Sequence, residues 1–214
     1  VACGAAASAQ DWTRFRGPNG TGECEFKSIP SSWTDADINW KVALPGEGHS
    51  SPAIWGEKIF LLSANPKDAT RYVLCLSTKD GSELWRKEFK SAPHHLHARS
   101  SYASCSPAVD AEQVYVAWSD PDHTLFKAFG HDGVERWSAD FGSWVSQHGF
   151  GSPPIVYEDL VILSCSQEPS KQANTPPPGD SFVVALDRKT GKQKWKTPRK
   201  TCLLYTSDAA DEGL

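Results

Sequence analysis

Histidine is the residue type whose placement in this sequence most directly indicates a binding site. His49 and His148 each lie within five residues before the proline of a Ser-Pro pair, and Tyr102 holds the equivalent place before a third pair. Imidazole nitrogens bind metals when neutral and anionic groups when protonated. If the three pairs open equivalent strands around an axis, we expect His49, Tyr102 and His148 to bind one cofactor or ligand, with His97 next. The alternative is a set of solvated loop histidines.

The cysteines form no recognisable metal or redox motif. Four of them, Cys24, Cys75, Cys105 and Cys165, stand apart, and no C-x-x-C occurs. Cys75 falls where two related segments have alanine, which favours a small buried side chain, although two of these cysteines would be free to pair in an exported protein. Since P-loop, G-x-S-x-G and H-E-x-x-H patterns are also lacking, we assign no catalytic residue and no metal ligand.

Composition excludes two broad classes of protein. The 214 residues carry a net charge of −4 with a pI near 6.0, whereas a nucleic-acid-binding domain usually presents a basic face. No run of 18 apolar residues occurs, so no transmembrane helix is predicted. We therefore expect neither a nucleic-acid partner nor a membrane-spanning helix.

Three segments of the chain repeat one pattern, and these elements must position the histidines. Each segment holds four short β-rich runs separated by turn residues, and a glycine stands four residues before a tryptophan near its end. The copies cover residues 51–89, 105–141 and 151–199. Four antiparallel strands at a period near 50 residues are typical of a β-propeller blade. The predicted fold class is therefore all-β, an open fragment of about three four-stranded blades.

The repeated tryptophans, Trp85, Trp137 and Trp195, are predicted to hold the blades together. A blade cannot bury both of its faces alone, and a flat indole suits stacking on the turn of the next blade if its N–H finds an acceptor. We expect all three to occupy equivalent, largely buried positions. Trp195 should be more exposed, because no blade follows it in this sequence.

The third repeat resembles a known family. Residues 185–195 read ALDRKTGKQKW, which is similar to the tryptophan-docking motif of pyrroloquinoline-quinone (PQQ) repeats, and the other two copies depart only mildly. The resemblance covers about residues 38–199, and the segment DWTRFRGPNG at 11–20 is similar to the start of exported planctomycete-type members. It implies a partial propeller over 38–200, with residues 38–44 as a lone fourth strand, in a protein about twice this length.

Both ends of the chain are interpreted separately from the repeats. Residues 1–10 match the small-residue end of a signal peptide, with Ala7-Ser8-Ala9 before Gln10; alternatively, Cys3 is a lipidated cysteine. Residues 11–37 are taken as an N-terminal extension. Residues 201–214 resemble a translated sequencing adapter. We therefore expect a periplasmic or secreted protein, with a lipoprotein as a variant of that hypothesis.

Three functions are compatible with the resemblance. The favoured one is a non-catalytic binding or scaffolding propeller of the bacterial cell envelope, with protein or peptide partners on its loop-covered face. The alternatives are a PQQ-dependent quinoprotein oxidoreductase, which would also bind a small molecule, and a sensor domain of a larger protein. The adjacent cysteine pair of quinoprotein alcohol dehydrogenases is missing here. The cofactor is therefore left open, because no specific motif for PQQ occurs.

Overall fold

The computed structural model describes residues 11–18, 20–24, 31–146, 148–169 and 176–199 as three separate four-stranded antiparallel sheets. The first sheet contains β1 (Ala53–Trp55), β2 (Lys58–Ala64), β3 (Arg71–Ser77) and β4 (Glu83–Phe89). The second contains β5 (Ala108–Val109), β6 (Gln113–Ser119), β7 (Thr124–Gly130) and β8 (Glu135–Asp140). The third contains β9 (Ile155–Tyr157), β10 (Leu160–Cys165), β11 (Ser181–Asp187) and β12 (Gln193–Arg199). Within these described residues the only helix is the 3-10 turn η1 (Asp35–Asp37), so the all-β prediction is confirmed.

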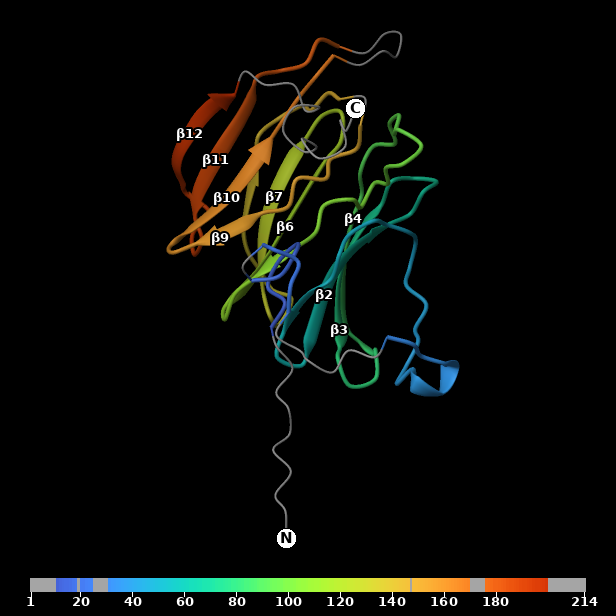
Figure 1. The fold of residues 1–214 in the computed structure, drawn as a ribbon. Coiled ribbons are helices and arrows are strands. Elements are labelled where there is room, and N and C mark those ends of the chain that lie inside the picture. Colours follow the sequence, from blue (N-terminus) through green and yellow to red (C-terminus); the bar gives the residue numbers. More distant parts are fainter. Residues whose placement is uncertain (1–10, 19, 25–30, 147, 170–175, 200–214) are drawn as a thin grey trace, which may run out of the picture.

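The sheets are successive blades around a common axis. Their first strands lie side by side, since β1 contacts β5 and β5 contacts β9, and the strand order within each sheet follows the chain outward. Figure 1 shows the middle sheet, in yellow-green, between the teal first sheet and the orange third sheet. This arrangement is that of a propeller fragment with its first strands innermost.

Burial along the strands follows from each blade's neighbours. Every residue of β6 is buried, because the middle blade has another blade on each face. In contrast, β10 alternates between buried and half-buried residues, and β12 is exposed along almost its whole length. The core therefore consists mainly of the interfaces between blades, where large side chains such as Phe60, Tyr115 and Phe129 are fully buried.

In each blade, a small residue followed by a β-bulge lies opposite the tryptophan. Cys75, Ala128 and Ala185 pair across the third and fourth strands with Trp85, Trp137 and Trp195, and the register shifts directly after each of them. A bulge of this kind twists a strand and re-aims the neighbouring side chain. The small residue facing the indole explains why a cysteine and two alanines hold equivalent positions.

The indoles of Trp85 and Trp137 contact the glycine turn of the following blade. A Cβ atom at Gly133 would lie 2.9 Å from Trp85, and one at Gly191 would lie 2.7 Å from Trp137. Both glycines have positive φ, 78° and 70°, a conformation that glycine adopts without steric cost. The indole Nε1 of Trp85 donates to the His131 carbonyl at 3.0 Å, and that of Trp137 donates to the Arg188 carbonyl at 2.9 Å.

Among the described residues, no blade follows Trp195 for its indole to contact. Its residue is 40% exposed, whereas Trp137 is 7% exposed. Trp85, which also contacts a following blade, is half-buried, so the expectation of a largely buried indole holds for Trp137 and only in part for Trp85.

Residues 38–44 do not form the lone strand expected from the sequence. No strand is assigned there, because among the described residues this segment has no neighbouring strand with which to form a ladder. Trp40 nevertheless makes the tryptophan contact: its Nε1 donates to the Thr78 carbonyl at 3.0 Å, and a Cβ at Gly81 would lie 2.5 Å from its ring. The indole contact thus forms without the strand pairing.

The N-terminal extension pairs with the innermost strands. Trp12 and Ile54 exchange backbone hydrogen bonds of 3.0 and 2.8 Å, and the Thr13 carbonyl accepts from Val109 N at 2.8 Å. Asp11 Oδ1 accepts from Gly56 N at 2.7 Å in the turn between β1 and β2. This segment, drawn in blue in Figure 1, therefore joins the first two blades at the axis. The signal-peptide and adapter interpretations fall on residues outside the described part of the chain.

We predict that Trp137→Ala lowers the free energy of unfolding by about 3–5 kcal/mol, as other large-to-small core changes do. The reason is that the change removes a buried indole and one of the two donors to the Arg188 carbonyl, which keeps only its bond from Gln113 Nε2. Chemical denaturation monitored by circular dichroism would measure the loss.

In the 214-residue chain, Trp195→Ala is the matched control, because no glycine turn among the described residues contacts this indole. Its expected cost is about 1 kcal/mol or less. Equal losses for Trp137→Ala and Trp195→Ala would contradict the proposed role of the contact between blades.

Candidate functional site

The connections that enter β1, β5 and β9 bond directly to one another. His49 N donates to the Ala103 carbonyl at 3.0 Å, and Ser51 N donates to Ser106 Oγ at 2.9 Å. Cys105 Sγ donates to the Ser152 carbonyl at 3.2 Å. The serines of the three Ser-Pro pairs therefore take part in a continuous loop-to-loop contact at one end of the axis. This arrangement brings together the loops that carry His49, Tyr102 and His148.

The side chains of His49 and Tyr102 differ in exposure and in hydrogen bonding. His49 is exposed, and its hydrogen bonds to other described residues are donated by its backbone N. The Tyr102 hydroxyl donates to the His94 carbonyl at 2.7 Å and accepts from His94 N at 3.1 Å. Tyr102 is thus a structural anchor for the connection between the first two blades, with its hydroxyl already paired.

His97 and His148 come together next to an acidic side chain. Their ring centroids are 5.2 Å apart, and His148 Nε2 lies 3.5 Å from Oε1 of Glu168. Glu168 is only 6% exposed and accepts a hydrogen bond from Ser146 Oγ at 3.0 Å. No group of three or more metal-binding side chains with suitable geometry is present among the described residues. The Glu168 carboxylate therefore lies beside His148, which in turn packs against the His97 ring.

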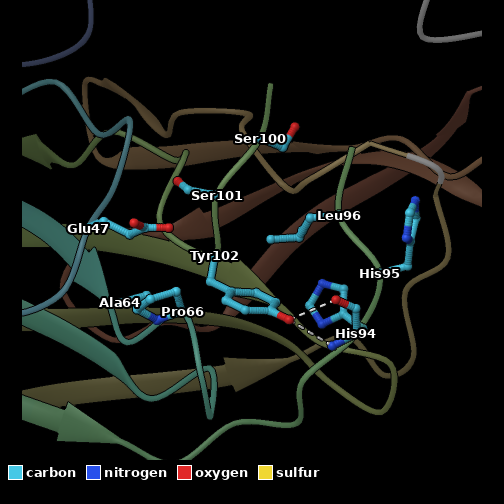
Figure 2. Close-up of a pocket in the computed structure, with 9 residues that line it drawn as sticks. All are labelled: Glu47, Ala64, Pro66, His94, His95, Leu96, Ser100, Ser101 and Tyr102. Atoms are coloured by element: carbon cyan, nitrogen blue, oxygen red, sulfur yellow. Dashed lines mark hydrogen bonds between the residues drawn. The ribbon is translucent and has the colours of Figure 1, made fainter. Parts of the chain in front are cut away.

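A cavity of about 340 Å³ opens between the first blade and the connection to the second. Figure 2 shows Glu47 on one side of it, Leu96 and His94 on the other, and the Tyr102 ring between them. Ser101 lies above the ring in this view. Tyr102 is the one predicted site residue that lines this cavity, because His49, His97 and His148 are not among its lining residues.

The buried, charged side chain of Arg71 packs against Tyr102, which lines the cavity. The Arg71 guanidinium lies 4.8 Å from the centroid of the Tyr102 ring and donates to the carbonyls of Ala69 and Ser119 at 2.8 and 2.9 Å. Burial lowers the pKa of Arg71 to about 10, so it remains charged at neutral pH, and the nearby Asp120 carboxylate opposes that shift. The Tyr102 ring therefore packs against both the Arg71 guanidinium and the His94 ring.

His94 contributes a neutral acceptor to the cavity. Its ring lies edge-on to Tyr102, and its Nδ1 is 3.1 Å from the Ala92 carbonyl. A carbonyl only accepts, so Nδ1 carries the proton and Nε2 keeps its lone pair. Burial lowers the pKa of His94, which favours this neutral form.

Two site residues are missed by reasoning from the sequence. Glu47 and Glu168 come from loops in different blades, and neither belongs to a motif. Each is placed by backbone pairing: Glu47 exchanges hydrogen bonds with Ala64 at the end of β2, and Glu168 N donates to the Val145 carbonyl. No local pattern would have identified them, since their positions depend on how the loops pack.

A family comparison identifies the repeats. The family model described as "Outer membrane protein assembly factor BamB" matches residues 69–211, more than half of the chain. The chain belongs to this BamB-like family of PQQ-repeat proteins. No curated protein sequence matches it.

Solved structures similar to this BamB-like chain have low identity to it. A europium-containing methanol dehydrogenase matches 72% of the chain with a TM-score of 0.49 and 18% identity. BamB from Moraxella catarrhalis matches 74% of the chain with a TM-score of 0.43 and 18% identity. A quinohemoprotein alcohol dehydrogenase from Comamonas testosteroni matches 71% of the chain with a TM-score of 0.47 and 16% identity. The chain spans only 25%, 54% and 28% of these structures, respectively.

No helix in its described part is long and apolar enough to cross a membrane.

The buried cysteines should be chemically inert in the folded chain. Burial raises the pKa of Cys75, Cys105 and Cys165 to about 12, so almost no thiolate exists at pH 8. We predict that iodoacetamide at pH 8 modifies the half-buried Cys24 and spares these three until the chain is unfolded in urea. Peptide-level mass spectrometry would resolve each site. Native-state modification of Cys105 as fast as that of Cys24 would contradict the burial.

Proposed function

We propose that this chain is part of a non-catalytic propeller that binds protein or peptide partners through the loop face at the end of its axis. The cell envelope is the proposed location. The family match supports this proposal, because the matched family is described as a factor in outer membrane protein assembly. Propeller loop faces are broad enough for peptide partners.

The direct bonds between the entry loops are the structural observation that carries this proposal. His49 N on the first loop binds the Ala103 carbonyl on the second, and Gly149 N on the third binds Ser100 Oγ at 3.2 Å. The loops therefore form one continuous surface over the inner strands. A surface of this kind favours an extended partner over a small molecule held between the blades.

The residues expected to bind one cofactor or ligand do not converge on a shared site among the described residues. The Tyr102 hydroxyl is engaged by His94, and the His148 ring faces Glu168. His49 is exposed and does not line the cavity beside Tyr102. We therefore derive no redox step for this chain and treat PQQ binding as an outcome of the test below.

Site-directed photo-crosslinking in bacteria that produce the full-length protein would test the binding face. A photoreactive amino acid at His49 or His97, both exposed on the loop face, should give adducts with envelope proteins. Glu57 and Lys79 are the control positions, because they form an exposed ion pair at the opposite ends of the blades. We expect few adducts there.

Two results would contradict the proposed function. One is an equal yield of adducts from both ends of the propeller. The other is the absence of adducts from the loop face combined with stoichiometric binding of PQQ and calcium, detected by quinone absorbance of the purified full-length protein. In that case His49→Ala together with His148→Ala would show whether those histidines hold the cofactor.

A further inference from the structure

We propose that the cavity bounded by Glu47, His94, Leu96 and Tyr102 binds a basic side chain, Arg or Lys, of a peptide partner. This inference rests on the proposed function for the origin of the peptide, and on the cavity itself for the chemistry. The cavity encloses about 340 Å³, which is at the lower end of the range for small-ligand sites. That size suits one long side chain.

Charge at the cavity favours a cation. Glu47 is the only carboxylate among its lining residues in the described chain, and none of them is Lys or Arg. Within the described residues the Glu47 carboxylate forms no hydrogen bond or ion pair, whereas Glu57 and Glu135 are paired with lysines. Figure 2 shows this carboxylate directed toward the middle of the cavity. An incoming cation would find an unneutralised partner there.

The buried Arg71 does not reverse this preference. Its guanidinium lies behind the Tyr102 ring, is 2% exposed, and donates to two backbone carbonyls. The Asp120 carboxylate lies close enough to interact with it electrostatically. Arg71 and Asp120 together contribute no net charge, so Glu47 sets the sign of the field at the cavity mouth.

The remaining walls suit the rest of a long basic side chain. In the neutral ring that burial favours, Nδ1 donates to the Ala92 carbonyl, so Nε2 of His94 is left as an acceptor for an N–H donor. Leu96, Pro66 and the Tyr102 ring give apolar surface for the methylene stem. The two bonds between Tyr102 and His94 fix the ring before any ligand arrives, which lowers the entropic cost of binding.

The backbone of Glu47 is held in place before any ligand binds. Its backbone forms two hydrogen bonds with Ala64, of 2.8 and 2.9 Å, at the end of β2. The carboxylate therefore projects from an anchored backbone on one side of the cavity, opposite the connection that carries His94 and Leu96. A basic side chain entering between them would contact the connection that enters β1 and the connection from β4 to β5.

A titration with capped amino acids tests the cavity independently of any protein partner. The full-length protein is titrated with N-acetyl-arginine methylamide, N-acetyl-lysine methylamide, N-acetyl-glutamine methylamide and N-acetyl-glutamate methylamide, and amide chemical shifts of Leu96 and Tyr102 are followed by NMR. The expected order is Arg and Lys above Gln, with Glu weakest. Shifts should be confined to the cavity.

Glu47→Gln should weaken arginine binding roughly five-fold, the upper range for one partly exposed ion pair. Glu57→Gln, at the opposite end of the blades, should leave it unchanged. Circular dichroism would establish that both variants fold. Leu96→Ala provides a second variant, which should weaken the arginine and glutamine ligands by the same factor because it removes only apolar contact.

The proposal is overturned if the glutamate derivative binds as well as the arginine derivative, or if Glu47→Gln binds arginine like the unchanged protein. Its failure is distinct from failure of the proposed function. Loop-face adducts from the unchanged protein, combined with no arginine binding to that protein, would retain the function and reject the cavity. Arginine binding without any loop-face adduct would retain the cavity and reject the protein partner.

Discussion

The rest of the structure depends on how each blade covers the face that its own strands cannot bury. A four-stranded sheet of this size exposes two apolar faces, and stacking against a neighbour removes both from water. At each interface in the described chain an indole from one blade lies on the glycine turn of the next and donates its N–H to a carbonyl there. Only glycine permits this approach, since a Cβ would overlap the ring.

This contact also determines where the entry loops of the three blades lie. Fixing the outer turns of one blade against the fourth strand of the previous one sets the angle between blades, so the inner strands β1, β5 and β9 meet at the axis. Polar bonds reinforce the same interface: Arg188 Nη1 lies 2.6 Å from Asp110 Oδ2, and Tyr115 donates to that oxygen at 2.8 Å. The loops above the inner strands are therefore brought close enough to bond to one another and to leave a cavity beside Tyr102.

The fold could be predicted from the sequence because its signals are local. A glycine four residues before each tryptophan and turn residues between short β-rich runs encode a blade without reference to the rest of the chain. The site could be predicted only in part. Tyr102 does line a cavity and His97 does meet His148, but Glu47 and Glu168 reach them from distant loops that carry no motif. The strand expected at 38–44 fails for a similar reason, since a strand needs a partner that local sequence cannot supply.

Hydrogen exchange measured by mass spectrometry on Trp137→Ala tests the central claim most directly, that the indole couples one blade to the next. The account predicts faster exchange in β9–β12 and in the facing strands β6 and β7, while β2 and β3 of the first blade keep their protection, because their interface still has Trp85 on Gly133. Equal loss of protection in all three blades, or no change in any, would contradict the account.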